Sequence, residues 1–162
     1  MLSQVERIIF LKSIPFFESA PMRQLLALAA AGVSEVYSPS QVILAAGDVP
    51  RALYIIVNGQ VQLTYFAGQR SMAQILEARD YFGEAHLFDD APCAFEAHAG
   101  QETLLLKLSH DALAAMMKTD LTLSFDVIRS LSREIKQRNE QIAQMTRKHT
   151  RGMHQLFDKL DG

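Results

Sequence analysis

The sequence predicts an α+β protein in which a barrel, sandwich or roll of short β-strands lies between two short helices and one long helix. Three observations predict it. Apolar residues recur at helical spacing before Val33, the period then becomes that of strands, and the helical period returns near Asp120. A length of 162 residues is enough for one domain with a sizeable core and one accessory element.

The composition is that of a globular protein, with 49% hydrophobic and 21% charged residues. No apolar run approaches the roughly 20 residues that a membrane helix needs, and we expect no membrane partner. The single cysteine, Cys93, excludes an intramolecular disulfide framework and any multi-cysteine metal site within one chain. Cytoplasmic localisation is therefore the expectation.

Two short helices open the chain. Residues 1–14 carry an amphipathic pattern with interspersed charges, which indicates a helix and not a signal peptide. Pro21 begins a second helix, and Gly32 ends it. We expect Phe16 and Phe17, in the connector between the helices, to anchor the core.

Short β-branched or aromatic segments follow one another from Val33, separated by turn residues. The dipeptide Asn58-Gly59 is the strongest turn signal, because a two-residue type I′ hairpin turn needs φ > 0 at both central positions. The predicted strands cover residues 33–37, 41–44, 53–57, 60–66, 71–76 and 103–108.

Helical patterns return after the strands. Ser109 is the predicted N-cap of a short helix that ends near Lys118. A longer helix begins near Asp120 and repeats apolar residues every seven positions, which predicts self-association through a coiled-coil-like seam. Gly152 is the expected site of an end or bend. The predicted dimer-interface residues are Leu121, Ile128, Leu131, Ile135, Ile142 and Met145.

The charge is distributed unevenly along the chain. Residues 1–120 hold 8 Lys or Arg against 13 Asp or Glu, a net charge of −5, whereas residues 121–162 hold 8 against 5, a net charge of +3. The basic residues of the second part alternate with heptad positions. This pattern favours a solvated helix face over a nucleic-acid-binding patch.

Residues 81–97, Y-F-G-E-A-H-L-F-D-D-A-P-C-A-F-E-A, combine a glycine, an acidic residue and a short apolar turn. Such a loop opening a short helix offers free N–H groups to an anion such as phosphate. From these residues alone, a glycine-led turn between two strands is the simpler interpretation.

Three segments give the chain a family resemblance: S-I-P-F-F-E-S-A-P-M-R-Q-L (13–25), A-A-G-D-V-P-R-A-L-Y-I-I-V-N-G-Q-V-Q-L (45–63) and D-Y-F-G-E-A-H-L-F (80–88). Together with the long helix they resemble the cyclic-nucleotide-binding effector domain of the cyclic AMP receptor protein and Fnr superfamily. The resemblance implies a double-stranded β-helix, also called a β-roll and jelly-roll-like, of about eight strands. It also implies a sensor domain over residues 1–119 and a dimerisation helix over residues 120–162.

The resemblance assigns residues 81–97 to the family's phosphate-binding cassette, with candidate ligand contacts at Gly83, Glu84, Ala85, Cys93 and Ala94. Glu84 matches the glutamate that takes the ribose hydroxyl in members that bind cyclic AMP. Cys93 and Ala94 stand where those members have arginine and serine or threonine. Loss of the guanidinium removes a charge-assisted contact to the cyclic phosphate, which argues against cyclic AMP and cyclic GMP.

A cassette without arginine resembles the nitrate-respiration and nitric-oxide-response branch of the Fnr-like regulators. That resemblance leaves haem and a gas-linked effector open, with His86, Cys93 and His98 as candidate axial ligands. Transcription regulators of the superfamily continue into a winged helix-turn-helix after the long helix. Contact with DNA is therefore expected only through a domain that this sequence does not contain.

No nucleophile elbow, P-loop or dinucleotide fingerprint occurs in the sequence, so an enzyme is not predicted. Two functions remain. One is the effector-sensing, dimeric regulatory domain of a Crp/Fnr-type transcription regulator. The other is a stand-alone domain of the same fold that acts as a dimeric interaction module without bound nucleotide.

Overall fold

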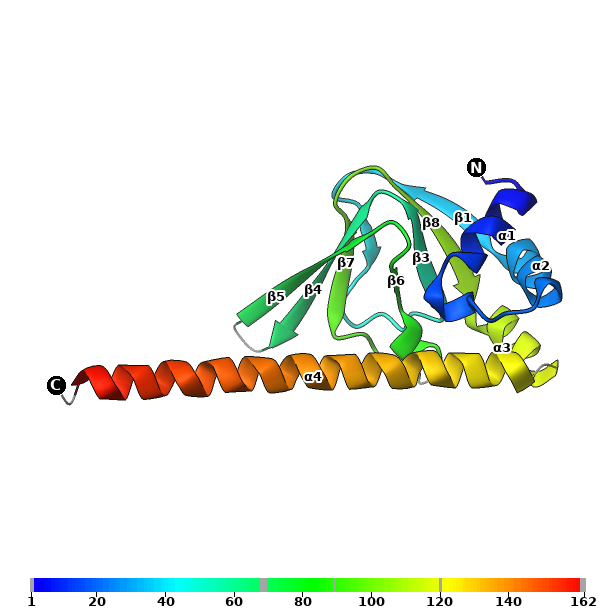
Figure 1. The fold of residues 1–162 in the computed structure, drawn as a ribbon. Coiled ribbons are helices and arrows are strands. Elements are labelled where there is room, and N and C mark those ends of the chain that lie inside the picture. The colour runs from blue at the N-terminus through cyan, green and yellow to red at the C-terminus, as the bar shows by residue number, and fades with distance from the viewer. Residues whose placement is uncertain (1, 68–69, 89, 120, 161–162) are drawn as a thin grey trace. The chain divides into compact units, whose positions relative to one another are not determined.

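The computed structural model describes residues 2–67, 70–88, 90–119 and 121–160. It divides the chain into two compact units, residues 1–126 and 127–162. The first contains the helices and the β-roll that the sequence predicts, and the second contains most of the long helix (Figure 1). None of the described helices is both long and apolar enough to cross a membrane.

The N-terminal helices form where the sequence predicts them. Helix α1 (Gln4–Lys12) is followed by a 3-10 turn, η1 (Pro15–Phe17), and by α2 (Met22–Ala31). Phe16 and Phe17 are buried, as expected for core anchors. The guanidinium of Arg7 on α1 donates to the carbonyl oxygens of Ala29 and Gly32, 3.2 and 2.5 Å away. It thereby satisfies two carbonyl groups at the end of α2.

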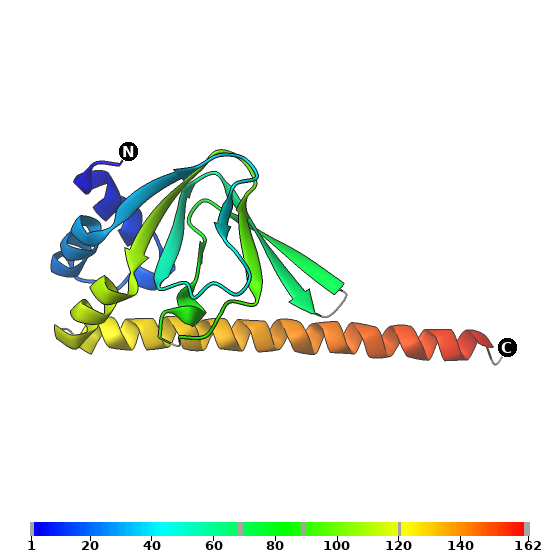
Figure 2. The same cartoon turned by 180° about the vertical axis from the view of Figure 1, so that it is seen from behind.

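In the part of the chain that the structure describes, eight strands make two four-stranded antiparallel sheets that face each other (Figures 1 and 2). The first sheet has the order β1-β8-β3-β6 and the second the order β2-β7-β4-β5. The predicted β-roll is confirmed. The strands are β1 (Val33–Tyr37), β2 (Val42–Leu44), β3 (Ala52–Asn58), β4 (Gln60–Ala67), β5 (Arg70–Glu77), β6 (Tyr81–Phe82), β7 (Phe95–Ala99) and β8 (Thr103–Ser109).

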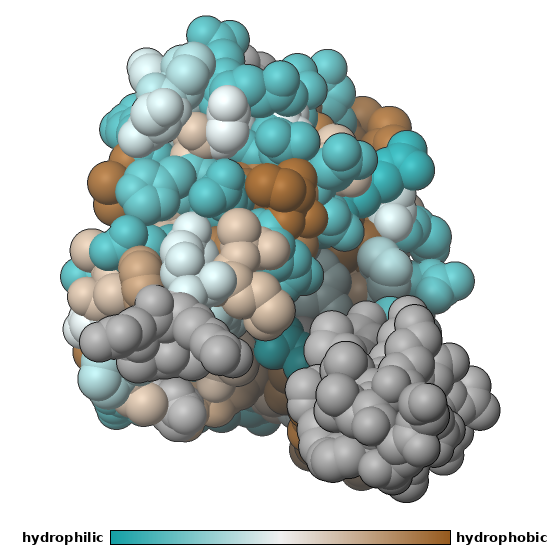
Figure 3. All heavy atoms as spheres, turned by 90° about the vertical axis from the view of Figure 1, so that its left-hand side faces the viewer, coloured by the Kyte–Doolittle hydropathy of each residue, from teal (hydrophilic) through white to brown (hydrophobic). Residues whose placement is uncertain are grey.

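The core lies between the two sheets. Alternate residues of β3 and β8 from one sheet meet alternate residues of β4 and β7 from the other, and their apolar side chains are almost completely removed from water. The outer surface differs from this interior. The face shown in Figure 3 is mostly hydrophilic, and its hydrophobic residues form smaller separate groups.

The prediction of a type I′ hairpin at Asn58-Gly59 is wrong. Strands β3 and β4 belong to different sheets, and only Gly59 has a positive φ, of 99°. A Cβ atom at Gly59 would lie 2.5 Å from Oγ1 of Thr103. The Thr103 hydroxyl accepts from the backbone N–H of Gln60 at 3.1 Å and fixes the chain as it crosses between sheets. Glycine is needed here for a tight interstrand corner.

Two helices follow the roll. Helix α3 (His110–Thr119) has the predicted N-cap, because the Ser109 hydroxyl accepts from the backbone N–H of Ala112 at 3.2 Å. Helix α4 (Leu121–Leu160) is 40 residues long. It continues through Gly152, where the sequence predicted an end or bend. One glycine lowers helix propensity only slightly, and the backbone hydrogen bonds of the helical residues before and after it outweigh this loss.

Candidate functional site

The loop after β6 begins with a left-handed glycine. Gly83 has φ = 89° and stands immediately before the 3-10 turn η2 (Glu84–His86). A Cβ atom at this position would lie 2.6 Å from the carbonyl oxygen of Ala52 on β3. Both the backbone angle and the close approach to β3 therefore require glycine.

The two residues after Gly83 lie in different surroundings. Glu84 is buried, with 7% of its surface exposed, whereas Ala85 is exposed. A buried carboxylate at this point is suited to accept hydrogen bonds from a ligand hydroxyl. The structure thus places the acidic residue of the predicted cassette at the start of η2, with its side chain buried.

The far end of the loop is fastened to the turn at residues 45–48. The backbone N–H of Cys93 donates to the Asp48 carbonyl at 2.8 Å, and the Gly47 N–H donates to the Cys93 carbonyl at 3.0 Å. The Cys93 thiol is buried and lies 3.2 and 3.3 Å from the carbonyl oxygens of Ala45 and Phe95. The thiol therefore occupies a packed, hydrogen-bonded position, while the neighbouring Ala94 is exposed.

Cationic groups near the loop are engaged with carboxylates. Residues 81–97 contain no lysine or arginine. Arg51 lies 3.5 Å from Asp90 of the loop and 3.4 Å from Nδ1 of His110. Lys107, on β8, lies 3.6 Å from Glu35 and 5.6 Å from the ring centroid of Tyr54. The loop itself therefore supplies no guanidinium or ammonium group to an anion.

The three candidate axial ligands do not share one environment. His86, in η2, has a buried Nδ1 atom with no hydrogen-bond partner, and its ring lies 5.9 Å from that of Phe95 in an edge-on arrangement. His98 alternates with the buried residues of β7 and faces the other side of that strand. Within the described residues, no three His, Cys, Asp or Glu side chains converge as a metal site. Of the three, His86 is the one with a buried ring nitrogen that has no hydrogen-bond partner.

A stacked aromatic pair, Tyr54 and Phe82, lies beside the loop and was not predicted from the sequence. Tyr54 of β3 stacks on Phe82, with ring centroids 5.0 Å apart and planes 9° apart, directly beside Gly83. Burial, followed by the charges of Glu35 and Asp48, raises the pKa of Tyr54 to about 12. Burial also raises the pKa of Tyr37, which donates to Glu35. Ala52, Tyr54 and Ile56 occupy alternate positions of β3, and this sequence pattern could have predicted that Tyr54 faces the core.

The predicted dimer residues lie on α4. Leu121, Ile128, Ile135 and Ile142 are between 56% and 73% exposed in the single chain, although all four are large and apolar. Leu131 is half-buried, and the side chain of Met145 lies outside the described residues. Phe125, which the heptad pattern did not include, is equally exposed at 63%. The helix therefore presents a row of apolar side chains that this chain does not cover.

The fold and the loop identify the family. The model of the cyclic nucleotide-binding domain matches residues 34–120, which is more than half of the chain. The chain belongs to this family. The match includes both sheets and the loop at residues 81–97.

Three relatives illustrate the range of the similarity. The CRP-like cAMP-activated global transcriptional regulator of Mycobacterium tuberculosis is 28% identical over 105 residues, covering 64% of this chain and 47% of the relative. The sensor domain of the transcriptional regulator DNR from Pseudomonas aeruginosa superposes with a TM-score of 0.73 at 21% identity, covering 85% of this chain and 93% of that chain. The regulatory domain of Toxoplasma gondii protein kinase A, solved with cAMP, superposes with a TM-score of 0.70 at 23% identity, covering 83% and 50%.

These relatives place the chain among sensor domains similar to those of Crp/Fnr regulators. The chain spans about half the length of the curated regulators that it matches. Below 25% identity the superpositions show the shared fold. Regulatory domains of this family are typically not catalytic.

Proposed function

We propose that this chain is the effector-sensing domain of a dimeric Crp/Fnr-type transcription regulator whose effector is not cyclic AMP. DNA would be contacted through a separate DNA-binding domain of the regulator. The nearest functional branch would be that of nitrate respiration and the nitric-oxide response, with a small-molecule or gas-linked effector.

The observation that carries the proposal is the position of Cys93. Its thiol lies between two backbone carbonyls in a buried position, where a cyclic-AMP-binding cassette would hold an arginine. A cyclic phosphate there would lose its hydration without gaining a cationic partner. The loss of such a charge-assisted contact costs on the order of several kcal/mol.

The uncovered apolar row on α4 supports the dimeric state. Leu121, Ile128, Ile135 and Ile142 recur every seven residues and are largely exposed in the single chain. Two such helices side by side would bury these residues against one another. A dimeric sensor could then transmit an effector signal by changing how the two helices pack.

His86 supports a haem-linked effector. Its buried Nδ1 atom lacks a partner, and an imidazole nitrogen is a common axial ligand of haem iron. A bound haem would supply an iron centre able to take a diatomic gas. His98, which faces the other side of β7, is not proposed as its partner ligand.

Calorimetry with cyclic AMP and cyclic GMP tests the central claim. We expect no measurable heat of binding and no thermal stabilisation, whereas a ligand present at 100 times its Kd would add about 2.7 kcal/mol to the free energy of unfolding. The double variant Cys93→Arg with Ala94→Ser restores the missing side chains and serves as the gain-of-function comparison. Binding of cyclic AMP by the unaltered chain with a micromolar Kd would overturn the proposal.

The absorption spectrum after addition of haemin tests the effector class. We expect a shifted Soret band that is lost in His86→Ala and kept in the matched variant His98→Ala. A spectrum equal to that of free haemin would remove haem from the proposal. If cyclic nucleotides also fail to bind, that result would favour the alternative of a dimeric interaction module without a ligand.

A further inference from the structure

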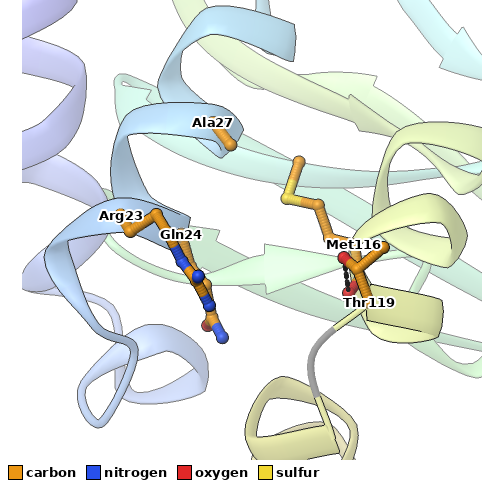
Figure 4. Close-up of a pocket in the computed structure, with 5 residues that line it drawn as sticks. All are labelled: Arg23, Gln24, Ala27, Met116 and Thr119. Atoms are coloured by element: carbon orange, nitrogen blue, oxygen red, sulfur yellow. Dashed lines mark hydrogen bonds between the residues drawn. The ribbon is translucent and has the colours of Figure 1, made fainter.

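A pocket lies between α2 and α3, away from the loop at residues 81–97. It has a volume of about 290 Å³ and is lined by Arg23, Gln24, Ala27, Met116 and Thr119. Figure 4 shows Arg23 and Gln24 extending from α2, and Met116 reaching from α3 toward Ala27. All five residues belong to the first compact unit.

Gln24 is the unusual member of this set. Only 4% of its surface is exposed, and neither its Oε1 nor its Nε2 atom has a hydrogen-bond partner. Buried polar side chains are nearly always hydrogen-bonded, because an unmet donor or acceptor destabilises the folded state. The side-chain amide of Gln24 lines a pocket and lacks hydrogen bonds at both its oxygen and its nitrogen. A bound molecule in the pocket could supply both hydrogen bonds.

The amide can be turned toward the pocket at little cost. Rotation about the last side-chain bond of glutamine is broad, so its amide plane is not fixed by the rest of the side chain. The remaining walls are suited to a small organic molecule. Ala27 and Met116 supply apolar surface, and the Thr119 hydroxyl donates to the Met116 carbonyl at 3.0 Å, which leaves its oxygen able to accept.

We propose that this pocket binds a small molecule with an amide-type edge, in which an N–H donor and a carbonyl acceptor are adjacent. A primary carboxamide or a lactam, including the lactam edge of a nucleobase, has this arrangement. It would meet the Oε1 and Nε2 atoms of Gln24 with two parallel hydrogen bonds. The volume is near the lower end of that of small-molecule sites, about 300 Å³, and therefore favours a single ring over a whole nucleotide.

The pocket is linked to the start of α4. The Ser124 hydroxyl in the first turn of α4 donates to the carbonyl of Met117 on α3 at 3.0 Å, next to the pocket residue Met116. A molecule held between α2 and α3 would restrain α3 and, through this bond, the first turn of α4. The site is independent of the cassette and of the effector proposed for it.

Nuclear magnetic resonance on the full 162-residue chain tests the site. The probe is uracil, and 1,3-dimethyluracil, whose ring nitrogens cannot donate, is the matched control. We expect millimolar uracil to shift the side-chain amide resonances of Gln24, identified by their absence from Gln24→Met. We expect no such shift with the dimethyl compound. Equal shifts with both compounds, or none with either, would overturn the proposal.

The stability of Gln24→Met provides a second readout. Methionine has a similar length and no unmet donor or acceptor, so the variant should melt about 2–4 °C higher for each kcal/mol of relieved cost while losing the uracil response. A lower melting temperature would show that the fold itself needs the amide, and would contradict the proposal. The cyclic nucleotide and haemin measurements do not bear on this outcome.

Discussion

At the scale of single residues, the strictest requirement in the candidate site is at Gly83. Its φ of 89° acts together with its closeness to β3, since a Cβ atom at this position would lie 2.6 Å from the Ala52 carbonyl oxygen. Gly47 has a similar φ, of 91°, but nothing lies within 4 Å of its Cβ position. A side chain at Gly47 would therefore meet backbone strain alone, whereas a side chain at Gly83 would meet backbone strain and a steric conflict.

We expect Gly83→Ala to destabilise the protein more than Gly47→Ala. The strained backbone alone costs about 1–3 kcal/mol, and only Gly83→Ala adds the conflict with β3. Urea unfolding of both variants measures the difference. Equal losses of stability in the two variants would show that β3 moves aside freely. That result would contradict a steric requirement for glycine at position 83.

Tyr54 predicts a dependence of stability on alkaline pH. Its pKa is raised from 10.0 to about 12, so the folded state keeps the phenol proton at pH values where the unfolded chain has lost it. The stabilising contribution is complete below pH 10 and is lost as the pH rises toward 12. By pH 11 the loss amounts to about 1.4 kcal/mol.

Urea unfolding at pH 9 and pH 11 measures this contribution. We expect the unaltered chain to lose more stability between these two values than Tyr54→Phe does. Tyr37→Phe is the companion variant, because burial also raises the pKa of Tyr37. An identical pH dependence in the unaltered chain and Tyr54→Phe would contradict the assigned role of Tyr54.

At the scale of elements, α1 begins with a capping box. The Ser3 hydroxyl accepts from the Glu6 N–H at 3.3 Å, and the Ser3 N–H donates to the Glu6 carboxylate at 2.7 Å. The hydrogen bond with the Ser3 side chain, and then that with its backbone, lowers the pKa of Glu6. The stabilisation from the carboxylate is therefore present at neutral pH and is lost as the pH falls through this lowered pKa.

We expect Ser3→Ala to lower the free energy of unfolding by about 1 kcal/mol, because an N-cap hydrogen bond is lost. The exposed neighbour Gln4 provides the control, and Gln4→Ala should leave stability unchanged. Chemical denaturation at pH 7 makes the comparison. No difference between Ser3→Ala and the control would show that the box does not hold α1.

Elements with local signals were predictable from the sequence. Period and capping located both N-terminal helices, the Ser109 cap and the long helix, because each depends on residues three to seven positions apart. The Asn58-Gly59 corner was misassigned because its conformation depends on Thr103, more than 40 positions away. Strand β6 has only two residues, too few to show an alternating pattern. Strand β7 does alternate over its five residues, F-E-A-H-A, but this pattern was not recognised as a strand in the sequence.

The candidate site was predictable to a similar extent. Gly83 and Glu84 follow from a local motif, and the structure adds that Gly83 has a left-handed backbone and that Glu84 is buried. The Cys93 thiol contacts the Ala45 carbonyl, and Tyr54 stacks on Phe82. Both contacts depend on how the strands pair, so they could not be predicted from the sequence. Gln24 was hidden within an ordinary helical pattern, since burial without a partner has no sequence signal.

At the scale of the whole molecule, the apolar row on α4 is the feature that an isolated chain does not explain. Ile135 and Ile142 are 62% and 60% exposed, and burying such a side chain contributes about 1.5–3 kcal/mol. Positions seven residues apart return to the same side of a two-helix seam. A second copy of α4 is the simplest partner with a matching pattern.

The double variant Ile135→Asp with Ile142→Asp should therefore convert a dimer to a monomer, because each aspartate would place a charge inside the apolar seam. Light scattering measures the mass, and circular dichroism should show that the helix content of each chain is retained. Gln137→Asp with Gln144→Asp adds the same charge, with the same seven-residue spacing, on an exposed part of the helix outside the seam. That control should stay dimeric. An unchanged mass in the isoleucine variant would place the interface elsewhere, and a monomer in both variants would attribute dissociation to net charge.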